Sequence, residues 1–315
     1  MKKTLTAFAA SLTFSLPSVA SQINVGVSMA TFDDNFLTVL RTAMESHAQQ
    51  LTSQGQAVDL QIEDSKNEVG TQLNQIQNFV ASGVDAIIVN PVDTDATMSI
   101  TSEAQAAGIP LVYVNRQPIN VDFLPDNQAF IASNEVDSGT LQTQEVCRLL
   151  GGKGDIAVLM GALTDQAGIQ RTKDIHDVIA TPACSGMTVI AEQTGQWQRT
   201  LANDITTNWL TSGMTFDAVI ANNDEMAIGA IQALKAFGVD MDSVIVAGID
   251  ATQDALEYMR QGELEVTVFQ DAAGQGAGAL DVAVSLVEGE TVDQKVWVPF
   301  ELVTPANMAD YANRN

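Results

Sequence analysis

The sequence has few basic residues and almost no histidine. Lys and Arg together number 14, against 39 Asp and Glu, which gives a formal net charge of -25. Nucleic acids and anionic membranes are bound by clustered basic residues, so this composition argues against both as partners. The only two histidines, His47 and His176, lie in helical patterns, so we expect neither a histidine-based catalytic triad nor a zinc site.

The sequence also lacks the glycine-rich loops that hold phosphate groups in many enzymes. The first apolar run ends in Ser28–Thr31 without a dinucleotide fingerprint, and Gly151–Gly154 lacks the spacing of a P-loop. Asp33 and Asp34 are the residue types of a glycosidase, but adjacent residues are not expected to face one cleft together. We therefore expect no enzymatic activity and no cofactor.

Long apolar runs are missing after the N-terminus, where none approaches the roughly 20 residues that cross a bilayer. The N-terminus has the features of a secretory signal. Lys2 and Lys3 precede an apolar run over 5–16, and Ser18–Ala20 is a small-residue cleavage site. We predict cleavage near Ala20 and an exported mature chain that begins at Ser21. The shortness of the run disfavours a membrane anchor, and the lack of a nearby cysteine disfavours a lipid anchor.

Only two cysteines are present, Cys147 and Cys184. Export into an oxidising compartment favours a structural disulfide between them. Spacing alone does not establish the pairing, so two free thiols remain the alternative.

Apolar runs alternate with helical patterns in the first half of the chain. The predicted strands span residues 23–29, 57–62, 85–89 and 110–114, and the predicted helices span 35–51, 71–81 and 94–107. Such alternation indicates βαβ units with a parallel sheet, and the continuous apolar strands indicate burial on both faces. The stretch 117–128 interrupts this rhythm with Pro118 and Pro125.

The alternation restarts near Ser133. Further strands are predicted at 155–160, 187–191, 217–221 and 243–248, each followed by a helical pattern. A short apolar run at 266–269, a helix over 276–287 and an extended segment over 296–303 complete the chain. We therefore predict an α/β protein of two doubly wound parallel-sheet domains.

Polar and aromatic side chains follow nearly every predicted strand, where open parallel sheets bind their ligands. They are Asp33, Asp34, Asn35, Phe36, Asn90, Asn115, Arg116, the segment 164–171, Trp197, Asn223, Asp224, Asp250 and Gln270. Planar polar groups bridge hydroxyls, and Phe36 and Trp197 are suited to stack on a ring, so the pattern predicts a site for a small neutral polyhydroxylated ligand. Each of these residues also has an alternative role when it is considered alone. Phe36 and Trp197 could belong to the hydrophobic core, Arg116 and Arg171 could be surface charges, and Asp34, Asn223 or Asp224 could cap a helix.

Four segments carry a resemblance to a known family, and these are Asp33–Phe36, Asn90–Asp93, Asn222–Ala227 and Ala247–Asp250. On them, the chain resembles the periplasmic sugar-binding proteins of the ribose/galactose-binding type, the solute receptors of ABC importers. The resemblance covers nearly all of the mature sequence. It implies a periplasmic location and an ABC importer permease as partner, and we expect a monomer.

The type I periplasmic binding protein fold of this family joins two α/β domains by three hinge crossings, which the resemblance places near Ser133, Gln270 and Glu301. The N-terminal domain would comprise residues 21–132 and 271–300, and the C-terminal domain residues 133–270 and 301–315. The implied ligand site consists of Asp34, Phe36, Asn90, Asn115 and Arg116 from the first domain, Arg171, Trp197, Asn223 and Asp250 from the second, and Gln270 at the hinge. Phe36 and Trp197 would sandwich the ligand ring.

Departures from the family pattern bear on specificity. Ala30 stands where the galactose binders have an aromatic residue, and Asn115 stands where the ribose binders have an aspartate. Gly151–Gly154 replaces the calcium loop of the galactose binders, so no metal site is expected.

The inositol- and rhizopine-binding branch is the part of the family that Arg171–Asp174, Trp197–Thr200 and Pro299–Pro305 resemble most. The resemblance therefore favours a cyclitol such as myo-inositol, with galactose, glucose or a pentose as alternatives. A second possible role is signalling, in which the closed form engages a chemoreceptor or a sensor kinase. A transcription regulator with a similar core would need a DNA-binding helix-turn-helix before the first strand, where the signal peptide lies.

Overall fold

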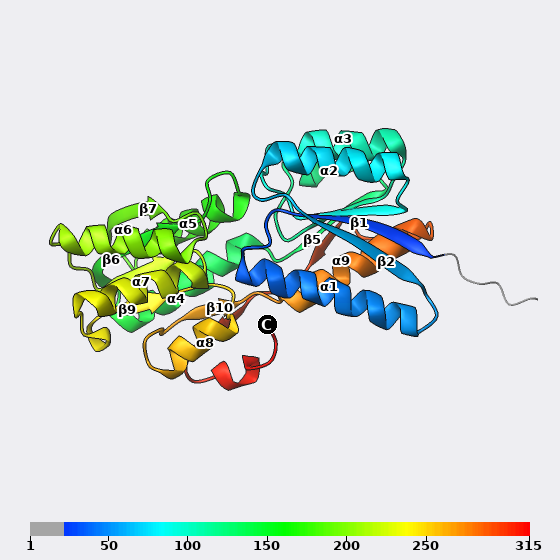
Figure 1. Cartoon of the computed structure of the whole chain (residues 1–315). Helices are drawn as coiled ribbons and strands as arrows, with labels where there is room; N and C mark the ends of the chain where they lie inside the picture. The colour runs from blue at the N-terminus through cyan, green and yellow to red at the C-terminus, as the bar shows by residue number, and fades with distance from the viewer. Residues whose placement is uncertain (1–21) are drawn as a thin grey trace, which may run out of the picture.

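The computed structural model describes residues 22–315, and the predicted signal peptide lies outside them. Two lobes, each built on a parallel sheet, lie side by side (Figure 1). No helix within residues 22–315 is both long and apolar enough to cross a membrane.

The first lobe contains a six-stranded parallel sheet in the order β11-β5-β4-β3-β1-β2. Its strands are β1 (Ile23–Met29), β2 (Val58–Asp64), β3 (Ala86–Val89), β4 (Leu111–Val114), β5 (Gln128–Ala132) and β11 (Lys295–Trp297). Its helices are α1 (Asn35–Ser53), α2 (Val69–Ser82), α3 (Thr97–Ala107), α9 (Ala272–Val287) and the short 3-10 helix η1 (Val121–Phe123).

Helices cover both faces of this sheet, because its strands are apolar on both sides. In β3, Ala86 and Ile88 pack in the cluster that contains α1 and α9, whereas Ile87 and Val89 pack in the cluster that contains α2 and α3. Figure 1 shows these two helix pairs on opposite faces of the sheet.

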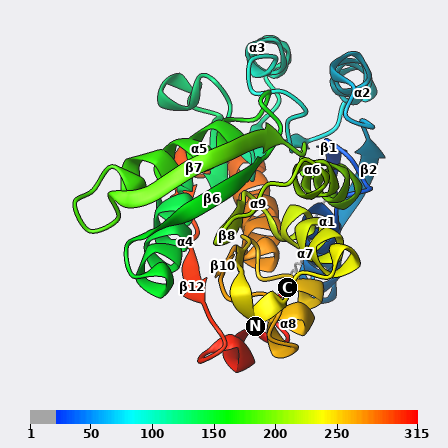
Figure 2. The same cartoon turned by 90° about the vertical axis from the view of Figure 1, so that its left-hand side faces the viewer.

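The second lobe contains a four-stranded parallel sheet in the order β7-β6-β8-β9. Its strands are β6 (Lys153–Met160), β7 (Gly186–Thr194), β8 (Ala218–Ala221) and β9 (Ile245–Ala247), with an antiparallel pair β10 (Thr267–Phe269) and β12 (Glu301–Val303) beside them. Its helices are α4 (Glu135–Leu150), α5 (Gln166–Ile179), α6 (Arg199–Thr211), α7 (Asp224–Phe237), α8 (Gln253–Arg260), η2 (Met241–Ser243) and η3 (Met308–Tyr311). Figure 2 views this lobe from its end and shows helices on both faces of its sheet.

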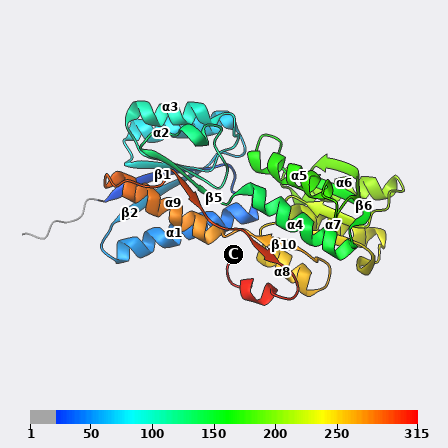
Figure 3. The same cartoon turned by 180° about the vertical axis from the view of Figure 1, so that it is seen from behind.

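The chain passes between the lobes at three places: after β5, after β10, and between β11 and β12. In Figure 3 the last of these crossings is the red-orange segment that runs from the first lobe into the second. The backbone ties the crossings to the sheets, since Val298 N donates to Ala132 O at 2.9 Å and Gln270 N donates to Asp250 O at 3.3 Å.

Three elements differ from the sequence predictions. Residues 128–132 form β5, which was not predicted; its first residue, Gln128, is buried, and its Nε2 donates to Thr101 O at 3.0 Å. Helix α9 begins at Ala272 instead of Gly276, because the Asp271 side chain caps its first turn through Gly274 N at 2.8 Å. The extended segment over 296–303 forms two strands in different sheets.

The predicted disulfide between Cys147 and Cys184 is confirmed. It joins the end of α4 to the segment just before β7, within the apolar core between α4, α5 and the second sheet.

Candidate functional site

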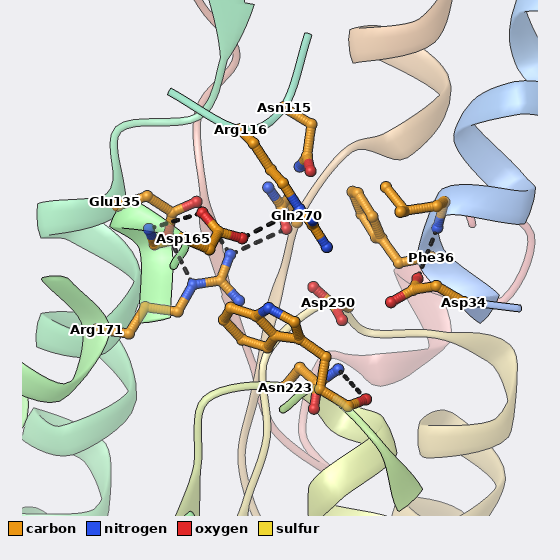
Figure 4. A pocket seen from close by; sticks show the side chains of 13 residues that line it. Asp34, Phe36, Asn115, Arg116, Glu135, Asp165, Arg171, Asn223, Asp250 and Gln270 are labelled. Carbon is orange, nitrogen blue, oxygen red and sulfur yellow. Dashed lines mark hydrogen bonds and ion pairs between the residues drawn. The ribbon is translucent and has the colours of Figure 1, made fainter. Parts of the chain in front are cut away.

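A small cavity lies between the two lobes, at the carboxyl ends of their strands. Nine of the ten predicted ligand residues line it, namely Asp34, Phe36, Asn115, Arg116, Arg171, Trp197, Asn223, Asp250 and Gln270. Leu37 and Glu135, which were not predicted, also line it, together with Asp165 and Ala167 of the predicted segment 164–171. Figure 4 shows the labelled side chains converging from both lobes.

Asn90 is the predicted residue that does not line the cavity. It is fully buried at the end of β3, where its Oδ1 accepts from Ala30 N at 3.3 Å. Its Nδ2 donates to Val114 O and to Asn115 Oδ1, both at 3.2 Å. Asn90 therefore supports Asn115, which does face the cavity.

The two aromatic residues of the cavity are held by local structure. Phe36 lies in the first turn of α1, which begins there because Asp34 Oδ1 accepts from Leu37 N at 2.8 Å. Trp197 lies in the loop before α6 and packs on Gly161, where an added Cβ would be only 2.1 Å from the indole ring. The Trp197 Nε1 is buried without a hydrogen-bond partner among the described residues.

Three residues of the cavity wall have a backbone that L-residues rarely adopt. Asn115 and Trp197 both have φ of 67°, and Asp250 has φ of 125°. Such conformations persist only where the surrounding structure enforces them, and they concentrate at functional sites. At Asp250, Asn315 Nδ2 donates to the backbone carbonyl at 2.8 Å and also to Gln270 O at 2.7 Å.

Arg171 is the centre of a buried polar network. The side chain is almost fully buried and pairs with Glu135 through both carboxylate oxygens, Nε to Oε2 at 2.6 Å and Nη2 to Oε1 at 3.0 Å. It also donates to Asn222 O at 2.7 Å and to Gln270 Oε1 at 3.2 Å. Burial opposes the charge of Arg171, but the adjacent Glu135 outweighs burial and raises the pKa of the guanidinium.

Arg116 connects the lobes. Its Nη1 donates to Pro91 O at 3.0 Å within the first lobe, and its Nε lies 3.1 Å from Asp165 Oδ2 of the second lobe. Nearby, Thr94 N donates to Thr164 O at 3.0 Å and adds a second contact across the cleft. The two lobes therefore touch beside the cavity.

Asn223 and Asp224 differ in role, which the sequence left open. Asn223 caps α7 through Met226 N at 3.0 Å and also lines the cavity. Asp224 is fully buried behind it and accepts from Thr252 N and from Thr267 Oγ1, both at 2.8 Å. Burial raises the pKa of Asp224 to about 7.

Asp34 and Asp250 are the carboxylates of the cavity without a guanidinium partner. Burial raises the pKa of Asp34, against the lowering effects of the Leu37 amide and Arg116. Burial also holds the pKa of Asp250 well above its usual range; Arg171 lowers it, and nearby carboxylates raise it further. Within residues 22–315, no group of three or more His, Cys, Asp or Glu is arranged to hold a metal ion.

Known proteins resemble this chain over nearly its whole length. The family model described as a periplasmic binding protein domain matches residues 25–291. A Rhizobium meliloti protein named for rhizopine binding is 59% identical over 315 residues, which are 100% of both chains.

Solved structures give the same result. An ABC transporter solute binding protein from Bacillus halodurans with bound myo-inositol is 41% identical, with a TM-score of 0.86, and the match covers 95% of this chain and 100% of that one. A Caulobacter myo-inositol binding protein bound to myo-inositol is 26% identical, with a TM-score of 0.84, over 92% of this chain and 96% of that one.

These relatives are solute-binding proteins and not enzymes, as expected from the sequence. The predicted α/β architecture is confirmed, since the structural neighbours are type I periplasmic binding proteins. The chain therefore belongs to the family of periplasmic binding proteins.

Proposed function

We propose that this protein binds a cyclitol of the myo-inositol type in the cavity between its lobes and delivers it to the permease of an ABC importer. The observation that carries the proposal is the cavity itself, which is small and lined by planar polar groups and two aromatic side chains. Such a wall complements a ring that has hydroxyls at its edge and C–H groups on its faces. Relatives that bind myo-inositol support the choice of a cyclitol.

The ten residues predicted from the sequence are proposed to act in two ways. The nine that line the cavity contact the ligand, whereas Asn90 positions Asn115. The lobes are proposed to act as the two predicted domains, which separate at the three crossings to release the ligand and close around it when it binds. Secretion into the periplasm and action as a monomer are part of the same proposal.

Calorimetric titration of refolded, ligand-stripped protein tests this function. We expect myo-inositol to bind more tightly than galactose, glucose or ribose. Arg171→Ala should abolish binding, because it removes the group that orients Gln270 on the cavity wall and holds the backbone carbonyl of Asn222. Among residues 22–315 the exposed Arg148 pairs only with Glu145 of its own helix, so Arg148→Ala is a matched control that should bind normally. Tighter binding of a hexose or pentose would reject the cyclitol, and uptake of labelled ligand by a deletion strain tests import.

A further inference from the structure

The side chain of Asn315 joins three backbone groups around the crossing that follows β10. Its Nδ2 donates to Asp250 O at 2.8 Å and to Gln270 O at 2.7 Å, and its Oδ1 accepts from Ala272 N at 3.1 Å. Asp250 belongs to the second lobe, Gln270 to the crossing, and Ala272 to the first turn of α9 in the first lobe. Asn315 therefore ties both lobes to the segment that connects them.

The loop that carries Asp250 depends on support of this kind. Asp250 has φ of 125° and Ala251 has φ of 52°, so two consecutive residues adopt a backbone that L-residues rarely take. Strained backbone persists only where its surroundings enforce it. Thr267 Oγ1 accepts from Ala251 N at 3.1 Å, and the direct bond from Gln270 N to Asp250 O is long, at 3.3 Å. The shorter hydrogen bond from Asn315 therefore holds the carbonyl side of this loop.

Arg314 holds the neighbouring Asn315 against the same part of the molecule. Its guanidinium carbon lies 4.1 Å from the centre of the Phe269 ring, and its Nη2 lies 3.1 Å from Glu301 Oε1. Phe269 ends β10 and Glu301 begins β12, so these contacts attach the segment 308–315 to two of the three crossings. Figure 3 shows this segment, in red, next to β10.

We propose that Asn315 is a positioning residue for ligand binding, which clamps Asp250 and Gln270 in the geometry that the ligand site requires. The inference rests on the proposed function, because both residues line the cavity in which the ligand is proposed to bind. Asn315 does not line this cavity, so it acts through the two backbone carbonyls and not by contact with the ligand. Without the clamp the strained loop relaxes, and the affinity falls in proportion to the fraction of molecules that keep the binding geometry.

Calorimetry with myo-inositol tests the clamp in the full chain. Asn315→Ala removes all three hydrogen bonds and should weaken binding about tenfold or more. Asn315→Asp keeps the shape and the acceptor but turns an oxygen toward the carbonyls of Asp250 and Gln270, so it should weaken binding at least as much. Asn313→Ala is the matched control, because Asn313 is an exposed asparagine two positions away; it should bind within about twofold of the wild type.

Amide hydrogen exchange, followed by NMR of the ligand-free protein, separates local positioning from general destabilisation. The Gln270 and Ala272 amides lie at the clamp. The Val219 amide lies in the buried central strand β8 and exchanges through global unfolding. In Asn315→Ala we expect the rates at the clamp to rise about tenfold or more relative to the rate of Val219. An equal rise at all three amides would show a general loss of stability, and the positioning role would be rejected.

Circular dichroism verifies that each variant folds. If Asn315→Ala does not fold, the isosteric Asn315→Asp takes its place in both measurements. A change in Asn313→Ala equal to that in Asn315→Ala would mean that any substitution in this segment disturbs binding, and the clamp would be rejected.

The outcomes separate this inference from the proposed function. If the wild type binds myo-inositol and both variants of Asn315 bind it equally well, the clamp is refuted and the receptor function stands. If the wild type binds galactose or ribose instead, the cyclitol fails, and the same comparison with that sugar tests the clamp. If the wild type binds none of them, the proposed function fails and hydrogen exchange alone decides. Faster exchange of the Gln270 and Ala272 amides in Asn315→Ala would then support the clamp, and unchanged exchange would refute it.

Discussion

Replacement of Glu135 by Gln tests how much the buried ion pair between Glu135 and Arg171, in the cavity wall, contributes to stability. Glu135 contacts Arg171 through both carboxylate oxygens, and both side chains are at most 6% exposed. Loss of one partner from a buried pair costs about 3–5 kcal/mol, because the remaining charge stays buried without compensation. Asp165 and Asp250 still attract the guanidinium, so we expect the lower end of this range, about 3 kcal/mol.

Guanidinium denaturation of the ligand-free protein, followed by circular dichroism, measures this loss. Arg171→Met and the double variant with Glu135→Gln complete a thermodynamic cycle. We expect a coupling energy of about 2–3 kcal/mol, because removal of both charges leaves no unpaired ion. Asp122→Asn, which breaks the exposed pair with Lys295, is the control and should cost less than about 1 kcal/mol. A coupling below about 0.5 kcal/mol would refute the reasoning.

Three further predictions follow from the described geometry. Replacement of Cys147 and Cys184 by Ser removes a disulfide that closes a loop with a sequence separation of 37 residues. We expect the free energy of unfolding to fall by about 4 kcal/mol from loop entropy, so the variant should unfold at the same denaturant concentration as the reduced wild-type protein. Burial raises the pKa of Asp224 from 3.8 to about 7, so its contribution to stability is present at low pH and is lost as the pH rises through about 7. The free energy of unfolding, measured between pH 3.8 and about 7, should therefore decline as the pH rises. Asp224→Asn should flatten this pH dependence, and an unchanged slope in the variant would contradict the role given to Asp224. Gly161→Ala places a Cβ 2.1 Å from the Trp197 ring and should weaken ligand binding about tenfold or more in calorimetry, with normal circular dichroism; unchanged affinity would show that the indole position is not critical.

The strand ends were predictable because the relevant signals are local. Apolar runs, helical periodicity and the polar residue after each run lie within a few positions of one another, and a parallel sheet brings all such ends to one edge. Asp34, Trp197 and Asp250 were found in this way, and all three line the cavity. Strand β5 was not predicted, and its first residue, Gln128, is polar yet buried because it forms a tertiary hydrogen bond with Thr101 O.

Residues whose role depends on a distant partner were not predictable. Glu135 follows the first crossing and was not predicted, and Asp165 was predicted only as part of the segment 164–171. Their pairing with Arg171 and Arg116 could not be read from the sequence. Asn90 follows a strand like the others but turns away from the cavity toward Asn115.

The sequence by itself determined the α/β alternation, the export signal prediction and the residue types available for a polyol site. Only the tertiary structure decided that Cys147 and Cys184 are joined, that the lobes touch between Thr94 and Thr164, and which carboxylates keep a guanidinium partner. The physical reason is distance along the chain. Secondary structure and caps arise from neighbours within a few residues, whereas the ion pairs of the cavity join residues far apart in the sequence, Glu135 with Arg171 within the second lobe and Arg116 with Asp165 between the lobes.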